Sequence, residues 1–277
     1  MEERFDLHMH STASDGTMSP IALLEEAKKL NLRGISITDH DTVHAYSEEL
    51  FKKADELGVL LVPGVEFSTV YQGVSVHVLG YCFDWKSDRL REFCALHQAR
   101  RRGRNQEILE KLALLGYNLS MEELYEKNKG TVGRPHIAKL LQEKGIVSTV
   151  QEAFERFIGD KKPCYAKGEM FSLEETLSII HGASGKAVLA HPHFCRNPSF
   201  LRALLKEPFD GMECYYAKFP EKQNQELVTM ALEYGLIPTG GSDFHGEAIK
   251  PQNSMGVAYI TLEHVRKLGT CAYNIFL

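Results

Sequence analysis

Histidines and carboxylates recur where predicted strands end along this 277-residue chain. One ion takes about three or four such ligands in proteins, so a set of ten is enough for two or three ions. Taken singly, each side chain also fits a buried, hydrogen-bonded polar residue, but together they favour a metal centre. The ten candidates are His8, His10, Asp15, Asp39, His40, Glu66, His77, His191, Asp243 and His245.

The ligand types indicate the metals and the chemistry. Imidazole nitrogens and carboxylate oxygens without thiolates suit Mn, Fe or Zn, with Mg possible. Two or three divalent ions that share bridging carboxylates lower the pKa of a bound water and neutralise charge on a phosphate. The six cysteines contain no CxxC pair. In a chain of this size their spacing predicts reduced thiols and argues against a zinc finger or a disulfide framework.

Strand and helix patterns alternate on both sides of a purely helical stretch. Residues 5–10 alternate apolar and polar side chains, which predicts a strand, and Ser19-Pro20 is typical of a helix start. A helix then ends near Gly58. Further strands are predicted over 34–38, 59–66, 74–81, 186–190, 211–215 and 236–241. Helical patterns cover 87–115, 121–127, 134–143 and 150–157, and after the helical stretch they cover 173–181, 201–205 and 221–234.

The alternation predicts an α/β barrel interrupted by a helical insertion. We expect a first barrel part over residues 1–84, an insertion that caps the substrate over 85–165, and a second barrel part over 166–277. In parallel barrels the functional side chains collect at the carboxyl ends of the strands, where nearly all ten candidates fall. The glycines of Gly240-Gly241 are expected to let the following loop bend tightly toward the site.

Bulk composition is ordinary for a globular enzyme, with 43% hydrophobic and 25% charged residues. The net charge of −5 does not exclude nucleic acid, but it requires any phosphate recognition to be local. The first ten residues lack the features of a signal peptide, and no apolar run approaches the ~18 residues of a membrane span. We therefore expect a cytoplasmic protein with no membrane association and no obligate protein partner.

Five short motifs occur together in this chain. They are His8-x-His10-Ser11 with Ser14-Asp15-Gly16, Thr38-Asp39-His40-Asp41, Pro63-Gly64-Val65-Glu66, Ala190-His191-Pro192 and Gly241-Ser242-Asp243-Phe244-His245. The set resembles the motifs of the PHP (polymerase and histidinol phosphatase) superfamily from residue 5 to about residue 246. The resemblance implies a distorted (β/α)7 barrel with a two- or three-metal centre.

The resemblance also implies how the ligands are shared. His8, His10 and Asp243 would hold one ion, which Glu66 would bridge to a second ion. The second ion would be completed by His77 and His191, and the third would be held by Asp15, His40 and His245. Asp39 fits an orienting group better than a ligand. Glu66 and Asp243 are therefore expected in the catalytic centre, with His193 as a candidate proton donor to the leaving group or, equally, a surface loop histidine.

The helical stretch resembles the insertion of the nucleoside 3′,5′-bisphosphate phosphatase branch, whose members resemble a 5′-to-3′ exoribonuclease of the RNase AM type. A substrate with two phosphates needs a second anchor. Arg134 and His136 are the candidates, because Gly133-Arg134-Pro135-His136 opens a predicted helix and helix N-termini suit anions. The arginines of residues 100–104 are more typical of a solvated helix face, although Arg101 is retained as a candidate substrate contact.

The sequence thus predicts a metal-dependent phosphoric ester hydrolase whose partner is a nucleotide or a short RNA or DNA. It would release the 3′-phosphate of nucleoside 3′,5′-bisphosphates, act as a 5′-to-3′ exoribonuclease on 5′-phosphorylated short RNA, or do both. The alternatives are a histidinol-phosphatase-like enzyme, a metal-dependent amidohydrolase on the same barrel, and a non-catalytic module stabilised by metal. An amide substrate gives no reason for a second anion site, which favours the phosphoesterase.

Overall fold

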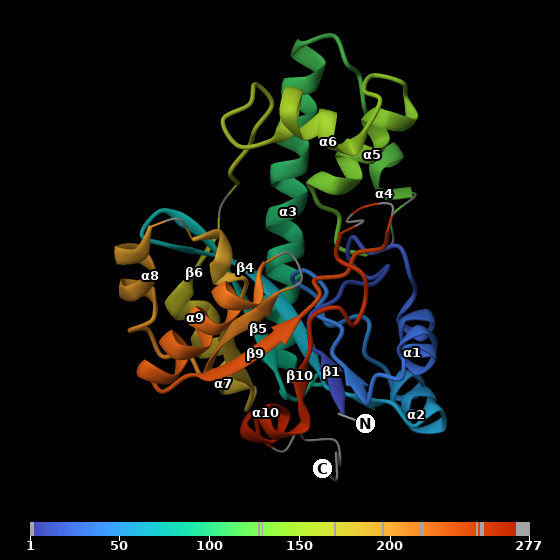
Figure 1. Cartoon of the computed structure of the whole chain (residues 1–277). Helices are drawn as coiled ribbons and strands as arrows, with labels where there is room; N and C mark the ends of the chain where they lie inside the picture. Colours follow the sequence, from blue (N-terminus) through green and yellow to red (C-terminus); the bar gives the residue numbers. More distant parts are fainter. Residues whose placement is uncertain are drawn as a thin grey trace.

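Ten strands form two mixed sheets in the computed structural model, which describes residues 3–126, 128, 130–168, 170–195, 197–216, 219–247, 249 and 252–269 (Figure 1). The smaller sheet has the order β10-β1-β2-β3, with β1 Arg4–Asp6, β2 Gly34–Ile35, β3 Leu60–Leu61 and β10 Ile260–Thr261. The larger has the order β6-β4-β5-β7-β8-β9. Its strands are β4 Gly64–Tyr71, β5 Val74–Tyr81, β6 Phe171–Ser172, β7 Lys186–Leu189, β8 Gly211–Tyr216 and β9 Ile237–Gly241.

The α/β class is as predicted, but the sheets are not parallel throughout. Strand β5 runs antiparallel to both of its neighbours, β4 and β7. The reversal follows from the turn at Gln72 and Gly73, whose φ angles of 48° and 80° are both positive. Two consecutive positive φ angles match the twist of a tight hairpin, so β4 and β5 pair directly without a crossover helix.

The expected closed barrel is not confirmed, because neither sheet closes among the described strands. Single bridges join the two sheets instead, between Met9 and Phe244 and between His40 and Glu66. The ladder of β1 ends early because the carboxylate of Asp6 accepts the amides of His8 and Ser242, at 3.3 and 2.9 Å. A side chain that takes the place of a neighbouring strand ends regular pairing.

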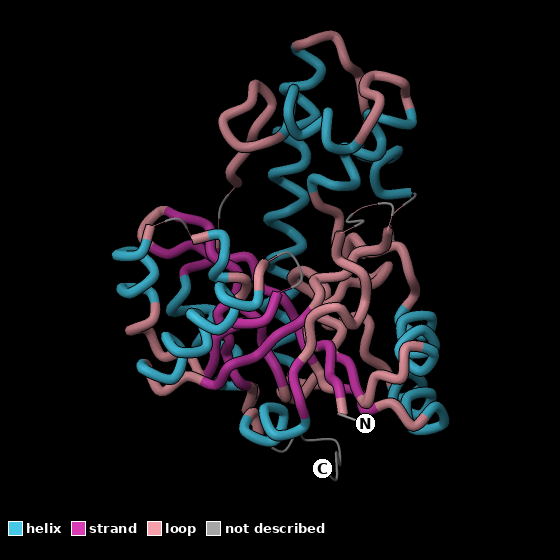
Figure 2. Tube along the Cα trace, in the orientation of Figure 1, coloured by secondary structure: helices cyan, strands magenta, loops and turns pink. Residues whose placement is uncertain are grey.

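Helices pack against both sheets. Helices α1 (Pro20–Lys29) and α2 (Glu48–Leu57) flank the smaller sheet, whereas α7 (Leu173–Gly182), α8 (Pro198–Leu204) and α9 (Glu221–Glu233) flank the larger one (Figure 2). Ser19 caps α1 and accepts the amide of Ala22 at 3.2 Å, and Gly58 ends α2 with a φ of 65°. Both ends are as predicted. The short helices η2 (Pro192–Phe194) and α10 (Leu262–Lys267) complete this part.

The stretch between β5 and β6 is helical, as predicted. It comprises α3 (Asp88–Leu114), α4 (Met121–Glu126), α5 (Arg134–Glu143), α6 (Val150–Ala153) and the π-helix η1 (Phe154–Ile158). Its upper helices share a hydrophobic cluster of their own, which includes Leu112, Ile137 and Ile158. The first turns of α3 join the main core through Leu90 and Phe93. Helix α3 thus connects the sheets to the helical part (Figure 1), while the expected limits at 85 and 165 stay a prediction.

One cysteine departs from the expected reduced state. Cys82 is disulfide-bonded, so the expectation of reduced thiols is wrong at that position. Four cysteines, Cys94, Cys164, Cys195 and Cys214, are free, and Cys271 lies outside the described residues.

None of the described helices combines the length and the apolar composition that a membrane crossing requires.

Candidate metal centre

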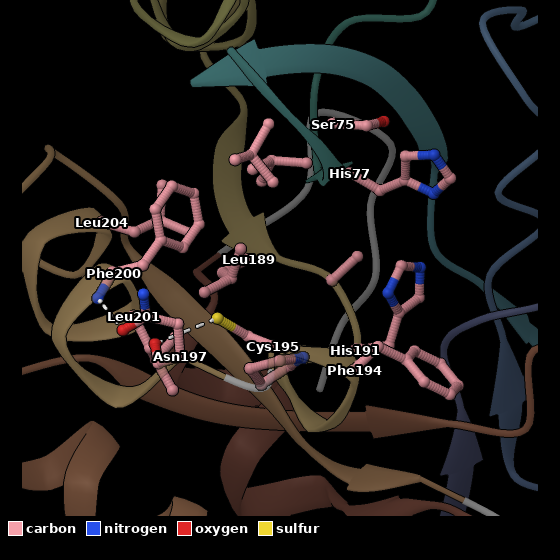
Figure 3. A pocket seen from close by; sticks show the side chains of 14 residues that line it. Ser75, His77, Leu189, His191, Phe194, Cys195, Asn197, Phe200, Leu201 and Leu204 are labelled. Carbon is pink, nitrogen blue, oxygen red and sulfur yellow. Dashed lines mark hydrogen bonds between the residues drawn. The ribbon is translucent and has the colours of Figure 1, made fainter. Parts of the chain in front are cut away.

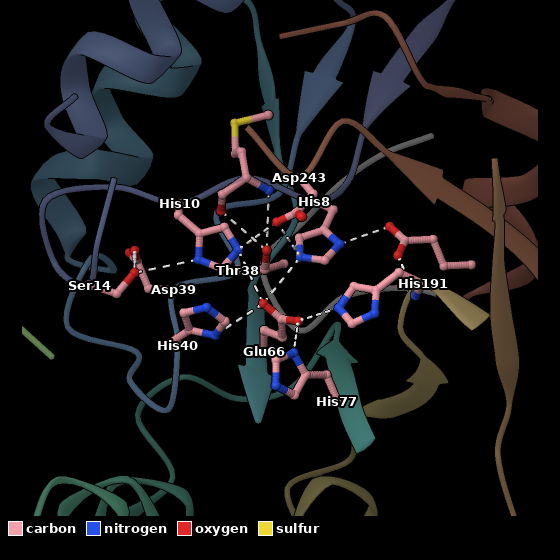
Figure 4. Close-up of polar contacts among 12 residues, drawn as sticks. His8, His10, Ser14, Thr38, Asp39, His40, Glu66, His77, His191 and Asp243 are labelled. Carbon is pink, nitrogen blue, oxygen red and sulfur yellow. Dashed lines mark hydrogen bonds and ion pairs between the residues drawn. The ribbon is translucent and has the colours of Figure 1, made fainter. Parts of the chain in front are cut away.

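Five imidazoles surround the buried carboxylate of Glu66 (Figure 4). Its Oε1 lies 2.7 Å from His77 Nδ1 and 2.9 Å from His191 Nε2. Its Oε2 lies 3.1 Å from His40 Nδ1, 3.2 Å from His10 Nε2 and 3.3 Å from His8 Nε2. The charges of His40, His77 and His8 overcome the effect of burial and hold the pKa of Glu66 well below its usual range. Glu66 is therefore the centre of the cluster.

Two further carboxylates complete the cluster. Asp243 Oδ1 lies 3.3 Å from His10 Nε2, 3.4 Å from His245 Nδ1 and 3.5 Å from His8 Nε2. Asp15 lies 3.5 Å from His245, 3.7 Å from His10 and 3.8 Å from His40. The structure thus brings all nine predicted ligand candidates together from segments far apart in the sequence.

The spacing of these atoms suits shared ions. Two ligand atoms at about 2.0–2.2 Å from one ion, at tetrahedral or octahedral angles, lie roughly 3.0–3.5 Å from each other. Most separations around Glu66 and Asp243 fall in or near that range. His10 Nε2 and His40 Nδ1 are buried without a hydrogen-bond partner among the described residues. Buried polar atoms are rarely left unpaired, so both atoms fit coordination better than hydrogen bonding.

Three groups of ligand atoms could each hold an ion. They are His8-His10-Glu66-Asp243, His10-Asp15-His40-His245 and His40-Glu66-His77. The first matches the set implied for one ion, and the second adds His10 to the set implied for another. The third has His40 where the resemblance places His191, although His191 also contacts Glu66. The assignment of each residue to a particular ion stays a prediction.

Most ligand candidates follow strands, as expected, whereas Glu66 and His77 lie inside β4 and β5. His8 and His10 follow β1, His191 lies two residues after β7, and Asp243 and His245 follow β9. Glu66 was expected at a strand end but lies inside β4, which continues to Tyr71. It still reaches the cluster because β4 passes beside it in the larger sheet, where Ser68 pairs with His77 of β5.

Two candidates have a left-handed backbone. His191 has a φ of 29° and Asp243 a φ of 53°, a region that is unfavourable for residues other than glycine. The amide of His191 donates to Glu213 Oε2 at 2.7 Å, and the amide of Asp243 donates to the His8 carbonyl at 2.8 Å. Such conformations cost about 1–3 kcal/mol each and concentrate at functional sites. These two hydrogen bonds hold both side chains toward the cluster.

Gly240 and Gly241 allow close packing of strands rather than the expected bend of the loop. Neither Gly240 nor Gly241 has a positive φ, so loop bending does not explain them. A Cβ on Gly240 would lie 2.6 Å from Tyr215 Cβ, and one on Gly241 would overlap the Cβ and the amide of His8. The glycines are required because β9 approaches the His8 segment and β8 too closely for a side chain.

Glu213 is a functional residue that the sequence interpretation missed. Its Oε1 lies 2.8 Å from His8 Nδ1, and both side chains are fully buried. This contact leaves His8 Nε2 facing Glu66 and Asp243. Burial alone would lower the pKa of His8, but the carboxylates of Glu213, Glu66 and Asp243 raise it well above its usual value. The available signal was a glutamate inside the otherwise apolar strand β8.

Other buried side chains support the ligands. Asp39, expected as an orienting group, accepts the amide and hydroxyl of Ser11 at 2.7 and 2.6 Å and the hydroxyl of Ser14 at 2.5 Å. It belongs to none of the three ligand groups. Tyr216 donates to Asp243 Oδ2 at 2.6 Å. These contacts fix the loop after His10 and the rotamer of Asp243.

Two predicted substrate contacts, Arg134 and His136, lie on the first turn of α5. Arg134 opens α5, donates to Asp160 at 3.0 Å and lies over the rings of Phe154 and Tyr165. His136 accepts the amide of Gly133 at 3.0 Å and lines a cavity that also includes Asp15. The pKa of His136 lies below its usual value, because the effect of burial outweighs that of the Asp15 charge. Both residues stay candidate substrate contacts.

His193 is buried and packs on Phe219, with ring centroids 4.6 Å apart. Its Nε2 lies 3.0 Å from Asn224 Oδ1, whereas Nδ1 has no hydrogen-bond partner among the described residues. The surface-loop alternative for His193 is therefore wrong. Its role as a proton donor stays a prediction.

The arginines at the start of the helical part are only partly a solvated face. Arg102 is exposed, but Arg100, Arg101 and Arg104 are half-buried and line one cavity. The interpretation as a solvated face is therefore wrong for these three. Arg101 Nε donates to Asp41 Oδ2 at 2.5 Å, and its Nη2 donates to Ser68 Oγ at 2.9 Å.

An apolar cavity of about 460 Å³ adjoins the cluster (Figure 3). His77 and His191 line the end nearest the cluster, and Leu189, Leu201 and Leu204 line the rest. Phe194, on η2, is 53% exposed beside it. A cavity of this size and lining suits a flat, largely apolar group held next to the metal ligands.

The chain is similar in sequence to known phosphoester hydrolases. The family model of the PHP domain matches residues 6–162. The chain is 34% identical over 250 residues to a 5′-3′ exoribonuclease of Haemophilus influenzae. The alignment covers 88% of this chain and 91% of the relative. It is 27% identical over 254 residues to a 3′,5′-nucleoside bisphosphate phosphatase of Chromobacterium violaceum, covering 87% and 86%.

A solved structure agrees as well. It is that of a presumed metal-dependent phosphoesterase of Bifidobacterium adolescentis, with 32% identity and a TM-score of 0.86 over 95% of this chain and 94% of that one. The resemblance found in the motifs is thereby confirmed, and the chain belongs to the PHP domain family, as a phosphoester hydrolase.

Proposed function

We propose that this protein is a multi-metal phosphoesterase that acts on phosphorylated nucleotides. It would remove the 3′-phosphate of nucleoside 3′,5′-bisphosphates, cleave short 5′-phosphorylated RNA from its 5′ end, or do both. The observation that carries the proposal is the convergence of five imidazoles on Glu66, with Asp243 and Asp15 beside them. The names of the two curated relatives support the two substrate classes.

The cluster would hold two or three divalent ions. Its donors are imidazole and carboxylate, which suit Mn, Fe or Zn, with Mg possible. When bound, such ions supply a water of lowered pKa and neutralise the charge that develops on a phosphate. The proposed ligands are His8, His10, Asp15, His40, Glu66, His77, His191, Asp243 and His245. Glu66 would be shared between ions, since each of its oxygens faces different imidazoles.

Residues of the chain would hold the metal ligands in place and supply a proton. Glu213 holds His8, and Tyr216 holds Asp243, each through a short buried hydrogen bond. Preorganised ligands need little reorganisation during the reaction. The departing 3′ oxygen needs a proton, and His193 is our candidate donor. His193 lies on the same short helix as the exposed Phe194, two residues from the proposed ligand His191.

The nucleoside would lie across the cluster, with its base in the apolar cavity. The cavity begins at the proposed ligands His77 and His191. A base bound in it would therefore place the attached ribose next to the metal cluster. Phe194 could stack on the base, because aromatic side chains bind bases of any sequence. The second phosphate would face the helical part of residues 85–165, where Arg134, His136 and Arg101 are the candidate contacts and the helices would act as a cap.

Phosphate release from adenosine 3′,5′-bisphosphate and from histidinol phosphate tests the proposal. The metal-loaded protein should prefer the bisphosphate, and Glu66→Gln should lose activity on it. The exposed Glu233→Gln on α9 serves as the matched control and should keep activity. Turnover of histidinol phosphate alone would contradict the substrate class. Absence of any hydrolysis in a protein that chelation destabilises would support a non-catalytic metal-stabilised module.

A further inference from the structure

A second large cavity opens at the other end of the metal cluster from the apolar one. We call it the Asp15 cavity, because Asp15 lines it, whereas His77 and His191 line the apolar cavity. Its volume is about 440 Å³. Ser14, which also lines it, and His191 lie on opposite sides of Glu66 (Figure 4). The cluster is therefore flanked by two cavities, each within the ~300–1,000 Å³ that is typical of small-molecule sites.

The lining of the Asp15 cavity combines apolar and polar side chains. The apolar ones are Pro135, Val150 and Ile249, and the polar ones include Thr12 and Asn128. Small-molecule sites join apolar surface to a few placed polar groups in this way. A nucleoside presents both kinds of surface, the apolar faces of its base and the hydroxyls of its ribose. The lining therefore fits a nucleoside better than a bare phosphate or a purely apolar group.

Positive charge in this cavity lies away from the cluster. His136 is close enough to Asp15 for its charge to act on that carboxylate. Lys139, which is exposed, also lines the cavity and lies about one turn farther along α5. Beyond it, Glu123 and Glu143 line an adjoining cavity of about 70 Å³. Lys139 is thus suited to the phosphate that follows a bound nucleoside, and the acids do not favour a longer track.

Backbone contacts hold the Asp15 cavity open without any movement of the helical part. The amide of Thr131 donates to the carbonyl of Ala13 at 2.8 Å. Gly130 packs so closely on the same loop that a Cβ would lie 2.2 Å from the Ala13 oxygen. A preformed site avoids the cost of ordering its walls when a ligand binds. The loop that carries Asp15 and the start of α5 therefore form fixed walls.

His136 belongs to these walls rather than to a phosphate site. Its Nδ1 accepts the amide of Gly133 at 3.0 Å, so the hydrogen of the neutral ring is on Nε2. The backbone of Ser14 also hydrogen-bonds to this ring. Because both nitrogens are engaged, His136 holds α5 against the loop of Asp15. The second phosphate is then left to Arg134 and Arg101.

Another cavity near the cluster is less suitable for nucleic acid. It has a volume of about 450 Å³, and its lining includes Tyr216, Phe219 and Glu221. None of the nine ligand candidates lines it, and its described lining has an acid but no lysine or arginine. A phosphodiester strand is repelled by acidic groups and attracted by basic ones. The Asp15 cavity is therefore favoured for the continuation of a strand.

We propose that the Asp15 cavity binds the nucleoside that follows the scissile phosphate of a 5′-phosphorylated RNA, with Lys139 at the next phosphate. This inference rests on the proposed function and adds to it a subsite for the downstream strand. Hydrolysis breaks the bond between phosphorus and the 3′ oxygen of the first nucleoside. Water supplies a hydroxyl to phosphorus and a proton to that oxygen. The phosphate stays on the second nucleoside, which becomes the new 5′ end.

Two diesters with the same scissile bond test the subsite. One is the 5′-phosphorylated dinucleotide pApA, and the other is adenosine 3′,5′-bisphosphate carrying a methyl ester on its 3′-phosphate. Only the first has a second nucleoside, and both release adenosine 5′-monophosphate. Wild type should prefer pApA by about fivefold or more in kcat/KM. Thr12→Phe, which puts a ring into the Asp15 cavity, should remove the preference.

Thr229→Phe, at an exposed threonine of α9, is the matched control and should keep the preference for pApA. Equal kcat/KM for the two diesters in wild type overturns the proposal, as does an unchanged preference in Thr12→Phe. If Phe219→Ala removes the preference while Thr12→Phe does not, the second nucleoside lies in the other cavity and the proposal is likewise overturned.

The role of Lys139 is tested with pApA and with pApAp, which carries one more phosphate. Wild type should release adenosine 5′-monophosphate from pApAp about threefold more efficiently. Lys139→Met should lose this advantage and Lys139→Arg should keep it. Lys52→Met, which removes the same charge from the exposed face of α2, should keep it as well. An advantage that persists in Lys139→Met overturns the placement of the downstream phosphate.

Binding of non-hydrolysable analogues separates this inference from the proposed function. In these analogues a methylene group replaces the 3′ oxygen of the scissile bond. The metal-loaded protein should bind the dinucleotide analogue about fivefold or more tightly than the methyl ester analogue, and Thr12→Phe should bind both alike. That result supports the subsite even if no substrate is hydrolysed. Hydrolysis of both diesters without any difference in binding overturns the subsite and leaves the phosphoesterase intact.

Discussion

His8 and Glu213 are 205 residues apart in sequence, and their side chains meet in a fully buried contact of 2.8 Å between Nδ1 and Oε1. Glu213 also accepts the amide of His191 through its other oxygen. One carboxylate therefore orients two ligand candidates from different strands. A carboxylate behind a ligating imidazole fixes its tautomer and its ring orientation, so Glu213 acts on the metal centre without facing it.

Glu213→Gln should weaken metal binding. The amide group of glutamine cannot accept from both His8 and His191, so one of the two contacts becomes unfavourable. Loss of such a supporting group typically costs about 10–100-fold in metal affinity. Titration of the metal-free protein with Mn²⁺ or Zn²⁺ measures the effect, with Glu233→Gln as the control. An unchanged affinity would contradict the role assigned to Glu213.

Metal removal should also lower stability. The cluster places buried carboxylates and imidazoles within 4 Å of each other, and ions bound only by the folded state stabilise it by about 2.7 kcal/mol at a hundredfold excess over the dissociation constant. A chelator should therefore lower the Tm of the wild-type protein. Because Glu66→Gln disrupts the shared ligand, its Tm should respond much less. Equal responses would exclude Glu66 as a ligand.

The ligand candidates could be predicted from sequence because their chemistry is specific to residue type and their segments end strands. Glu213 stands out in the sequence only as a glutamate inside an apolar strand, and its role depends on a partner 205 residues away. The reversal of β5 could not be predicted. The sequence predicts strands over 59–66 and 74–81, but whether β4 ends at Glu66 or continues to Tyr71 depends on sheet pairing rather than on local sequence.

The arginines of α3 show the same limit. A run of arginines on a helix predicts a solvated face, but Gly168 packs on the stem of Arg104 and Phe171 lies against the guanidinium of Arg100. Exposure of a helix face is decided by which segment packs on it. The helices themselves were well predicted, since their caps and apolar spacing are local features.

Gly241→Ala should disturb the metal centre through sterics alone. The added Cβ would overlap the backbone and Cβ of His8, and overpacking of this kind typically costs about 1–3 kcal/mol. We expect lower stability to urea and a lower metal content. Gly103→Ala is the matched control, because a Cβ at that exposed helical position meets nothing within 4 Å. It should be neutral or stabilising by up to about 1 kcal/mol.

Asp210→Asn should destabilise the fold at neutral pH. Burial alone would raise the pKa of Asp210, but hydrogen bonds from Lys186, the amide of Ala187 and His181 hold it below its usual value. A carboxyl group with a lowered pKa in the folded state stabilises the protein above its unfolded pKa of about 3.9, and the stabilisation is lost as pH falls.

The free energy of unfolding should therefore differ by about 1 kcal/mol between wild type and Asp210→Asn at pH 7, given the partial exposure of the group. The difference should shrink as pH falls toward 3. Urea denaturation at both pH values measures it. The exposed Asp55→Asn serves as the control, and a difference that is independent of pH would contradict the assignment.

Phe194→Ala should weaken substrate binding through the base. Phe194 is 53% exposed on η2, beside the apolar cavity, and its ring lies edge-on to that of His191 at 5.5 Å between centroids. Stacking of a base on an aromatic side chain contributes about 1–3 kcal/mol, so KM for adenosine 3′,5′-bisphosphate should rise about fivefold or more with little change in kcat. An abasic deoxyribose 3,5-bisphosphate should be hydrolysed equally by both proteins, because it has no base to lose contact. Leu232→Ala, at an exposed leucine of α9, controls for the loss of apolar surface. Should KM rise equally for the two substrates, the base does not lie in this cavity.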